Sequence, residues 1–313
     1  MEIAITGAGG YLGSALVRKH LERGDAVRAL LRASAKATPD PRARVFRGDL
    51  AHPDAIPDEF LERADVLYHC AAELSREALM HAVNVAGTRV LAERARGRVR
   101  HWVQVSTVAV YGRPRECVIT EESPVRPADL YARTKAEAET VVAEASRGEF
   151  SYTVLRPSGI FGPNMRNESL YRLISTLDRG LFFFVGGRGA TMNCVHEGNV
   201  VHALLLCAAR TEARRRVYNL SDDRVLEHFI AVLCRELGKP APRLRVPEAL
   251  ARTLASLLRL ASSFPLTKSR LDALTSRVLY PTTRIEQELG YRCVKPLEDG
   301  LAELVAEWQR RAQ

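Results

Sequence analysis

The sequence lacks the features that mark secreted, metal-binding or membrane-spanning chains. Its 6 cysteines are scattered with no Cys-x-x-Cys pair, and its 8 histidines show no metal-ligand spacing with them. No apolar run reaches transmembrane length, and no basic and apolar leader precedes the first strand-like segment. We therefore expect a cytoplasmic protein with reduced thiols, no bound metal ion and no stable membrane span.

Aromatic residues are also scarce, at 6% of the 313 residues, and they do not interleave with the basic clusters. Lysine and arginine exceed aspartate and glutamate by 46 to 37, with arginines gathered over 94–100 and 210–216. Without interleaved aromatics or a known binding module, we expect solvated helix ends and no nucleic-acid partner. The excess of +9 can still attract anionic ligands in general.

Hydrophobic residues make up 46% of the chain, and apolar strand-like runs alternate with helical patterns. This rhythm predicts a parallel sheet covered by helices on both faces. The predicted strands are Ile3–Thr6, Ala26–Leu31, Val45–Arg47, Val66–Cys70, Trp102–Ser106 and Tyr152–Leu155. The predicted helices cover 11–23, 78–96, 130–146 and 197–210.

A glycine-rich turn, TGAGGYLG, lies between the first strand and an amphipathic helix. Gly7 permits a tight turn, Gly10 lets backbone approach a pyrophosphate, and Gly13 lets helix pack on strand. Amide groups at the helix start then hold phosphate oxygens. A purely structural turn is the alternative, but the place between strand and helix favours dinucleotide binding.

The end of the second strand selects between NAD and NADP. An acid there would bind the adenosine ribose, whereas an arginine would pair with the extra phosphate of NADP. The sequence VRALLRASAK has Leu31 where the acid is expected, then Arg32, with Ser34 and Lys36 as further donors. This favours NADP(H), with NAD(H) as the alternative, unless Arg32 is simply an exposed strand end. Asp49 either contacts the adenine or caps the next turn.

The rhythm of strands and helices breaks after about residue 157. The fold class we predict is α/β, a Rossmann-type doubly wound parallel sheet with a smaller C-terminal substrate lobe. We assign 1–157 plus about 193–221 to the dinucleotide-binding domain, and about 158–192 and 222–313 to the lobe. An apolar helix over 248–261 is expected in the lobe core, with a cleft cover or a membrane contact as alternatives.

Tyr131 and Lys135 lie four positions apart in LYARTKAEAE and so share one helix face. A neighbouring ammonium, helped by an oxidised nicotinamide, favours the phenolate, which would bring the pKa of Tyr131 from near 10 toward working pH. Tyr131 could then exchange a proton with a substrate oxygen. Thr107, together with Ser106, ends a strand and could orient that oxygen, although strand-end capping is the alternative.

Jointly, the motifs resemble those of the extended short-chain dehydrogenase/reductase family. They are TGAGGYLG, GDL, HCAA, NVAGT, VSTVAVYG, YARTK, LRPSGIFGP, CVHEGNVVHA and LGYRCVKPLEDGL, and they cover nearly the whole chain. The resemblance implies that Thr107 is the catalytic Ser/Thr, Tyr131 the acid/base, Lys135 its partner and Asn84 the fourth member. We expect Asn84 to bind a water that links Lys135 to solvent.

In that family, residues 69–72 line the cofactor and 156–159 border its nicotinamide end. Relatives also pair the two helices predicted over 78–96 and 130–146 between subunits, so we expect a homodimer. The cofactor-binding residues we predict are Gly7, Gly10, Tyr11, Leu12, Gly13, Arg32, Asp49, Leu50, Cys70, Ala71, Ala72, Ser106, Lys135, Pro157 and Ser158.

Departures from the family patterns narrow the chemistry. Dehydratases of the family have a motif that resembles STDEVYG where this chain reads STVAVYG. Val108 and Ala109 stand in place of the two acidic residues and cannot move a proton. Epimerases often carry an asparagine where Gly159 stands and an Arg-Asp-Tyr where 192–194 read MNC. CVHEGNVVHA and Arg32 look more like the hydroxysteroid-dehydrogenase and dihydroflavonol-reductase branches, although FFFVGGRGATMN resembles epimerases.

The sequence therefore predicts an NADP(H)-preferring oxidoreductase that acts on a small-molecule ketone or secondary alcohol. A nucleotide-sugar epimerase with retained NAD is the alternative, and a non-catalytic nucleotide-binding regulator is a third reading. Phenylalanines at 161 and 182–184 suggest an apolar ligand, but they fit a core equally well.

Overall fold

A seven-stranded, wholly parallel sheet forms the larger part of the computed structural model, which describes residues 1–35, 40–165, 167–257 and 268–312. The strand order is β11-β7-β5-β4-β1-β2-β3, and every neighbouring pair is parallel. The strands are β1 (Glu2–Thr6), β2 (Ala26–Leu31), β3 (Arg44–Arg47), β4 (Ala64–His69), β5 (Val99–Val105), β7 (Ser151–Pro157) and β11 (Arg216–Leu220).

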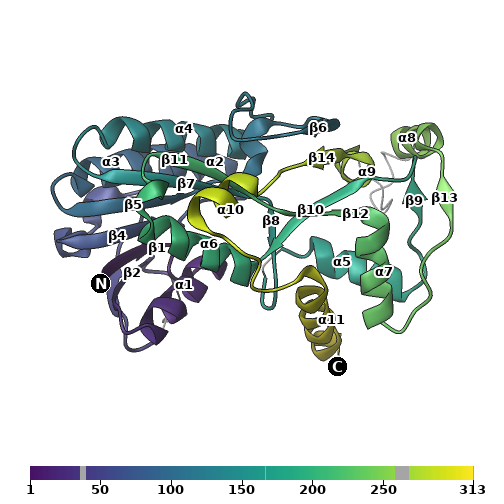
Figure 1. Cartoon of the computed structure of the whole chain (residues 1–313), viewed down its shortest axis with the longest axis horizontal. Helices are drawn as coiled ribbons and strands as arrows, with labels where there is room; N and C mark the ends of the chain where they lie inside the picture. The colour runs from purple at the N-terminus through teal and green to yellow at the C-terminus, as the bar shows by residue number, and fades with distance from the viewer. Residues whose placement is uncertain (36–39, 166, 258–267, 313) are drawn as a thin grey trace.

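Both faces of this sheet are buried, as the continuous apolar strands require. Ile3 and Ile5 on β1 lie in one core, with residues of α1 (Tyr11–Glu22) and α6 (Glu197–Ala209). Ala4 lies in the other core, with residues of α3 (Gly87–Ala95) and α4 (Leu130–Ala145). The two helix layers are visible above and below the sheet in Figure 1. The predicted Rossmann-type doubly wound sheet is confirmed.

The strand order reverses beside β1, because β2 lies on one side of it and β4 on the other. Ligands of open α/β sheets bind at such a switch point, outside the carboxyl ends of the strands. The loops that follow β1, β4, β5 and β7 all leave the sheet at this edge, since the strands are parallel.

The helix expected over 78–96 is interrupted. It consists of α2 (Glu77–His81), a π-helical turn (Ala82–Ala86) and α3, and Asn84 lies in the π turn. Thr88 donates its hydroxyl to the Asn84 carbonyl (2.7 Å). Such π turns are frequent at functional sites.

The smaller lobe, on the right in Figure 1, is built on a three-stranded sheet of order β12-β10-β8. These strands are β8 (Gly159–Phe161), β10 (Thr191–His196) and β12 (Asp222–Val225). Apolar residues of α5 (Ser169–Asp178), α7 (Leu226–Glu236) and α11 (Leu297–Ala312) form its core. Phe161 and Phe184 are both in this core, which is one of the two roles that the sequence left open for them.

The C-terminal segment does not stay in the lobe. Helix α10 (Thr283–Leu289) packs on α6 and β11, and its Ile285 and Leu289 belong to the core of the large sheet. Likewise, β14 (Arg277–Leu279) pairs with β6 (Glu116–Val118) from the first half of the chain. The two parts of the molecule are therefore joined by crossing chain segments.

The predicted apolar helix over 248–261 corresponds to α8 (Glu248–Leu257), and its last four positions lie outside the described residues. Ala251 of α8 is buried with Leu271 of α9 (Lys268–Thr275) and with Val185 of β9 (Phe184–Val185). Strand β13 (Arg245–Val246) pairs with β9 beside them. No helix in the described part of the chain is long and apolar enough to cross a bilayer.

We expect Gly13→Ala to destabilise the protein, because an added Cβ would lie 2.2 Å from the Gly7 carbonyl oxygen. Overpacking of this kind costs about 1–3 kcal/mol in the free energy of unfolding. Urea denaturation would measure it. Gly9→Ala is the control, because its Cβ would meet only a flexible methyl of Leu31 at 3.0 Å. Equal stability of the two variants would contradict the close approach of α1 to the Gly7 turn.

Candidate active site

The glycine turn is shaped by close contact with the loop after β4. Gly7 has a φ of 67°, and a Cβ there would lie 2.7 Å from the Ala71 nitrogen. Gly10 donates its N–H to the Gly7 carbonyl (2.8 Å), which closes the turn. A side chain is therefore excluded at Gly7 both by conformation and by space.

The first turn of α1 is open to an anion. Gly10 is the N-cap and supplies no side-chain cap, and the first turn contains no acidic residue. The amides of Tyr11, Leu12 and Gly13 consequently have no intrahelical acceptor and carry the positive end of the helix dipole. These residues fit the pyrophosphate of a dinucleotide.

The residues predicted to bind the adenosine end of the cofactor lie at the carboxyl ends of β2 and β3. Leu31 is buried, and Arg32 and Ser34 are exposed, whereas Lys36 lies outside the described residues. Asp49 accepts a hydrogen bond from the Ala51 N–H (3.0 Å), so it caps the following turn. Its contact with adenine stays a prediction. Leu50, which we also assigned to the cofactor, is buried where a Cβ on Gly87 would meet it at 2.8 Å.

Lys135 is held at the end of β5. Asp129 caps α4 by accepting from the Ala132 N–H (3.0 Å), and Tyr131 and Lys135 follow on the first turns. The Lys135 ammonium is 4% exposed and donates to the Val105 carbonyl (2.6 Å). Tyr131 is half-buried one turn earlier on the helix. Lys135 is thereby placed beside the segment that carries Thr107, and α4, which also carries Tyr131, contacts the 108–111 turn.

Burial dominates the protonation of this pair in the protein without cofactor. Burial lowers the pKa of Lys135 to about 8, although the Glu139 carboxylate opposes the shift. Burial, with a smaller contribution from Asp129, raises the pKa of Tyr131 to about 12. We expected Lys135, together with an oxidised nicotinamide, to lower the pKa of Tyr131. Without cofactor, burial shifts it in the opposite direction, and the lowered pKa in the cofactor-bound protein stays a prediction. Tyr131 is therefore a protonated phenol at neutral pH.

The two hydroxyls at the end of β5 have different surroundings. Thr107 Oγ1 accepts from the Ala109 N–H (3.2 Å) and caps the 3₁₀ turn Val108–Tyr111. This contact does not use the hydroxyl proton of Thr107. Ser106 is 3% exposed and donates its hydroxyl to Glu139, so that hydroxyl is engaged within the protein.

A buried ion pair lies behind these hydroxyls, and the sequence argument missed it. Arg156 on β7 donates to both carboxylate oxygens of Glu139 on α4, at 3.0 and 2.5 Å, and both side chains are at most 10% exposed. Arg156 also donates to the Tyr111 hydroxyl (2.7 Å), which in turn donates to Asn219 (2.9 Å) on β11. A signal was present in the sequence, because Glu139 lies four positions after Lys135 and continues its helix face.

Asn84 holds the loop that follows β4. Its side chain accepts from the Glu73 N–H (2.7 Å) and donates to the Glu73 carbonyl (3.0 Å) and to Thr134 (3.0 Å). These protein contacts use the Asn84 amide. The water that we predict between Lys135 and solvent stays a prediction.

Residues 69–72, which we predict to line the cofactor, lie partly inside the protein. His69 is buried, bonded to Thr6 (2.8 Å) and Thr88 (2.9 Å), and burial lowers its pKa to about 3. Ala71 donates its N–H to Thr6 (3.2 Å), and Cys70 and Ala72 are half-buried beside it.

The predicted nicotinamide border follows β7. Pro157 ends β7, and the N–H of Ser158 continues the pairing by donating to the Leu220 carbonyl (2.9 Å). Ser221 donates its hydroxyl to the Ser158 hydroxyl (2.9 Å). The resemblance also placed Arg156 at this border. Its side chain forms the buried ion pair with Glu139.

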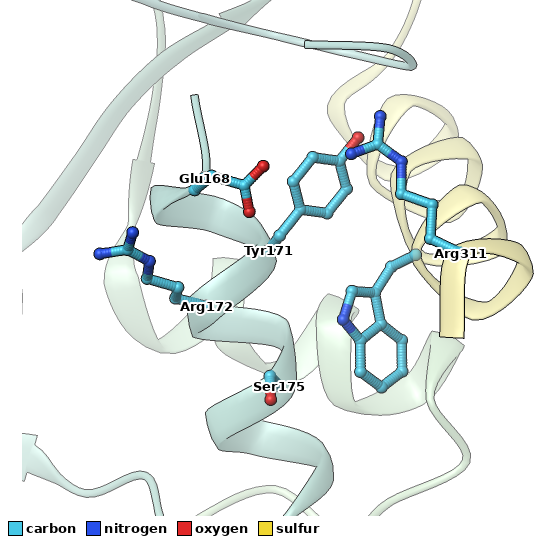
Figure 2. Close-up of a pocket in the computed structure, with 6 residues that line it drawn as sticks. Glu168, Tyr171, Arg172, Ser175 and Arg311 are labelled. Carbon is cyan, nitrogen blue, oxygen red and sulfur yellow. The ribbon is translucent and has the colours of Figure 1, made fainter. Parts of the chain in front are cut away.

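A separate hollow, shown in Figure 2, lies between α5 and α11. The Arg311 guanidinium lies 4.4 Å from the centre of the Tyr171 ring at one side of it. None of the predicted site residues lines this hollow. Its lining residues are Glu168, Tyr171, Arg172, Ser175, Trp308 and Arg311.

Comparison with known proteins gives a family match over most of the chain. Residues 3–221 match the model of the "NAD dependent epimerase/dehydratase family". The chain is 35% identical over 269 residues to the 4-hydroxy-2-methyl-3-oxo-4-farnesyl-3,4-dihydroquinoline-1-oxide ketoreductase of Stigmatella aurantiaca, covering 82% of this chain and 79% of the relative. It is 34% identical to sterol demethylase protein B of Methylococcus capsulatus, covering 82% and 81%.

Among solved structures, UDP-glucose 4-epimerase from Thermotoga maritima with UDP-glucose superposes with a TM-score of 0.78 over 100% of both chains. The sequence identity is 21%, so this likeness concerns the fold alone.

We expect Arg156→Met to lower the free energy of unfolding by about 3–5 kcal/mol, because it leaves the Glu139 carboxylate buried without its partner. Guanidinium denaturation would measure the loss. Arg113→Met removes an exposed ion pair with Asp129 and should cost at most about 1 kcal/mol. The double variant Glu139→Leu/Arg156→Met should recover part of the stability. A cost for Arg156→Met no larger than for Arg113→Met would contradict the buried ion pair.

Proposed function

Because the chain belongs to the NAD dependent epimerase/dehydratase family, as an extended short-chain dehydrogenase/reductase, we propose that it is an NADP(H)-preferring oxidoreductase that interconverts a ketone and a secondary alcohol. The observation that carries this proposal is the arrangement around the end of β5. The residues there are a buried Lys135 ammonium bonded to the Val105 carbonyl, Tyr131 one turn before it on α4, and the Thr107 hydroxyl. In the sheet, β4 lies between β5 and β1, where the strand order reverses.

A bound nicotinamide dinucleotide supplies or accepts the hydride. In the direction of reduction, the Tyr131 hydroxyl gives its proton to the substrate oxygen. Burial raises the pKa of Tyr131 to about 12 and so keeps this phenol protonated near neutral pH. The Tyr131 phenolate that remains is stabilised by the nearby positive charge of Lys135. Thr107 donates its hydroxyl proton to the same substrate oxygen and so fixes its direction.

In the direction of oxidation, Tyr131 must lose its proton before it can accept one from an alcohol. Burial of Tyr131 opposes this step, and the Lys135 charge together with the positive charge of an oxidised nicotinamide favours it. We therefore expect reduction of a ketone to be the easier direction near neutral pH.

Several features support a reaction limited to one oxygen. Val108 and Ala109 hold the two positions where dehydratases carry ionisable side chains, and Val108 is buried. The amide of Asn193, in the segment where epimerases often carry Arg-Asp-Tyr, donates to Asp223 (2.7 Å) and to the Val278 carbonyl (2.8 Å). That amide is consumed within the lobe and does not support a diphosphate ligand.

The second candidate is a nucleotide-sugar epimerase with retained NAD. We retain this candidate because the chain shares its fold with UDP-glucose 4-epimerase. The two candidates differ in how the cofactor is used. A reductase must exchange its cofactor in every turnover, whereas an epimerase recycles it in place. We also propose, on the family resemblance alone, a cytoplasmic homodimer paired through α3 and α4.

The nucleotide carried by the purified protein separates these candidates. We expect denatured protein to release far less than one equivalent of nucleotide, as measured by mass spectrometry, and the emptied protein to bind NADPH more tightly than NADH. Near-stoichiometric NAD⁺ carried through purification would instead establish the epimerase-type use of cofactor.

Replacement of Tyr131 by phenylalanine tests the proton donor. We expect Tyr131→Phe to lower turnover of ketones with NADPH by about 100-fold or more, because a positioned acid contributes on that scale. Thr107→Ser should retain more activity than Thr107→Ala, since serine keeps the hydroxyl. NADPH binding by each variant is the control for folding. Tyr131→Phe that turns over at the wild-type rate would remove Tyr131 from the reaction.

A further inference from the structure

Two arginines meet at the adenosine end of the site, although they lie on different strands. Strands β2 and β3 are neighbours, and Leu31 pairs with Arg47 at their carboxyl ends. Arg32 follows Leu31 directly, and both arginines are exposed. The chain after β2 closes a turn through a hydrogen bond from the Ala35 N–H to the Arg32 carbonyl (3.0 Å).

Arg47 is anchored to that turn. Its Nη1 donates to the Arg32 carbonyl (3.1 Å) and to the Ala35 carbonyl (3.4 Å). A guanidinium carries five N–H groups in a planar fork, so these contacts leave the Nε and Nη2 donors for another acceptor. The anchor fixes the position of a positive charge that would otherwise move on a long side chain.

The charge of this pair is not neutralised by the protein. Nearby, Arg42 pairs with Asp40 at 2.6 Å. Across the described ranges of the chain, by contrast, no carboxylate lies within ion-pair distance of Arg32 or Arg47. Two exposed guanidinium groups beside one turn, without a carboxylate between them, are suited to a phosphate dianion.

We propose that Arg47 is a second ligand of the 2′-phosphate of NADP(H), which it binds together with Arg32 across the ends of β2 and β3. This inference rests on the proposed preference for NADP(H). It adds a specificity-determining residue from the third strand to the one expected after the second. By binding the Arg32 and Ala35 carbonyls, Arg47 also covers the negative ends of two dipoles that a phosphate would otherwise meet.

A supporting role in the turn makes a different prediction from a role as a phosphate ligand. If Arg47 only held the 32–35 turn, its loss would weaken NADPH and NADH alike through the ribose, or would weaken NADPH only by displacing Arg32. A phosphate ligand affects NADPH alone, since NADH has no 2′-phosphate, and it does so with or without the Arg32 side chain. The ratio of the two dissociation constants, measured in the wild type and in an Arg32→Met background, therefore separates the roles without any knowledge of the substrate.

The experiment is calorimetric titration of the full chain with NADPH and with NADH. For Arg47→Met, the Kd of NADPH should rise about tenfold, the scale of one exposed charge-assisted hydrogen bond, while the Kd of NADH changes less than about twofold. Arg44→Met is the matched control. It removes the same charge from the other end of β3, where Arg44 pairs in register with Arg28, and it should leave both constants unchanged.

An equal loss of both cofactors in Arg47→Met, or no loss of either, would overturn the role of Arg47. So would a double variant Arg32→Met/Arg47→Met that binds NADPH no more weakly than Arg32→Met alone. Arg32→Met, measured in parallel, distinguishes this from a failure of the proposed function. If the wild type prefers NADPH and Arg32→Met loses that preference while Arg47→Met keeps it, only Arg47 is excluded. If the wild type shows no preference for NADPH, the cofactor proposal fails and the Arg47 proposal fails with it.

Discussion

The buried ion pair between Glu139 and Arg156 is the interaction around which the candidate site is organised. Two charges in a region of low dielectric are costly unless nearly every donor and acceptor is satisfied. Here Arg156 binds both oxygens of Glu139 and also the Tyr111 hydroxyl, and Glu139 accepts in addition from Ser106. The ion pair thereby joins α4, β5, β7 and the 3₁₀ turn. It holds both ends of the short segment 106–111, on which Thr107 lies.

The same burial that isolates the ion pair sets the protonation of its neighbours. Lys135 is close enough to the Glu139 carboxylate to gain from its charge, yet desolvation still lowers the lysine pKa to about 8. Tyr131 responds to burial in the opposite sense, because its charged form is the anion. Without cofactor, Tyr131 is therefore a neutral phenol, and the Lys135 ammonium loses its proton more readily than an exposed lysine does. In the proposed reaction, the positive charge of Lys135, together with that of an oxidised nicotinamide, would favour loss of the Tyr131 proton.

Local patterns were enough to predict the doubly wound sheet and the glycine turn, because alternation of elements and Gly7, Gly10 and Gly13 act within short stretches of sequence. Contacts between distant segments were not predictable in this way. Glu139 and Arg156 meet only because α4 packs on β7, and Asn84 reaches Glu73 only through a π turn that periodicity does not reveal. The return of α10 to the large sheet depends on packing against α6, and no turn residue in the sequence indicates this packing.

The net charge of the chain did not indicate which ligand the site binds, because contacts between distant segments decide which charged residues are paired. Several of the arginines are engaged in ion pairs, since Arg94 and Arg98 share Asp58, and Arg76 binds Glu73. A sequence count cannot separate these arginines from those without a carboxylate, because the partners lie on other elements. Strand register makes the separation: it places Arg47 beside the end of β2, where a parallel sheet directs its ligands. For the phosphate site proposed above, the position of a cation that has no carboxylate partner among the described residues is therefore more informative than the total charge of +9.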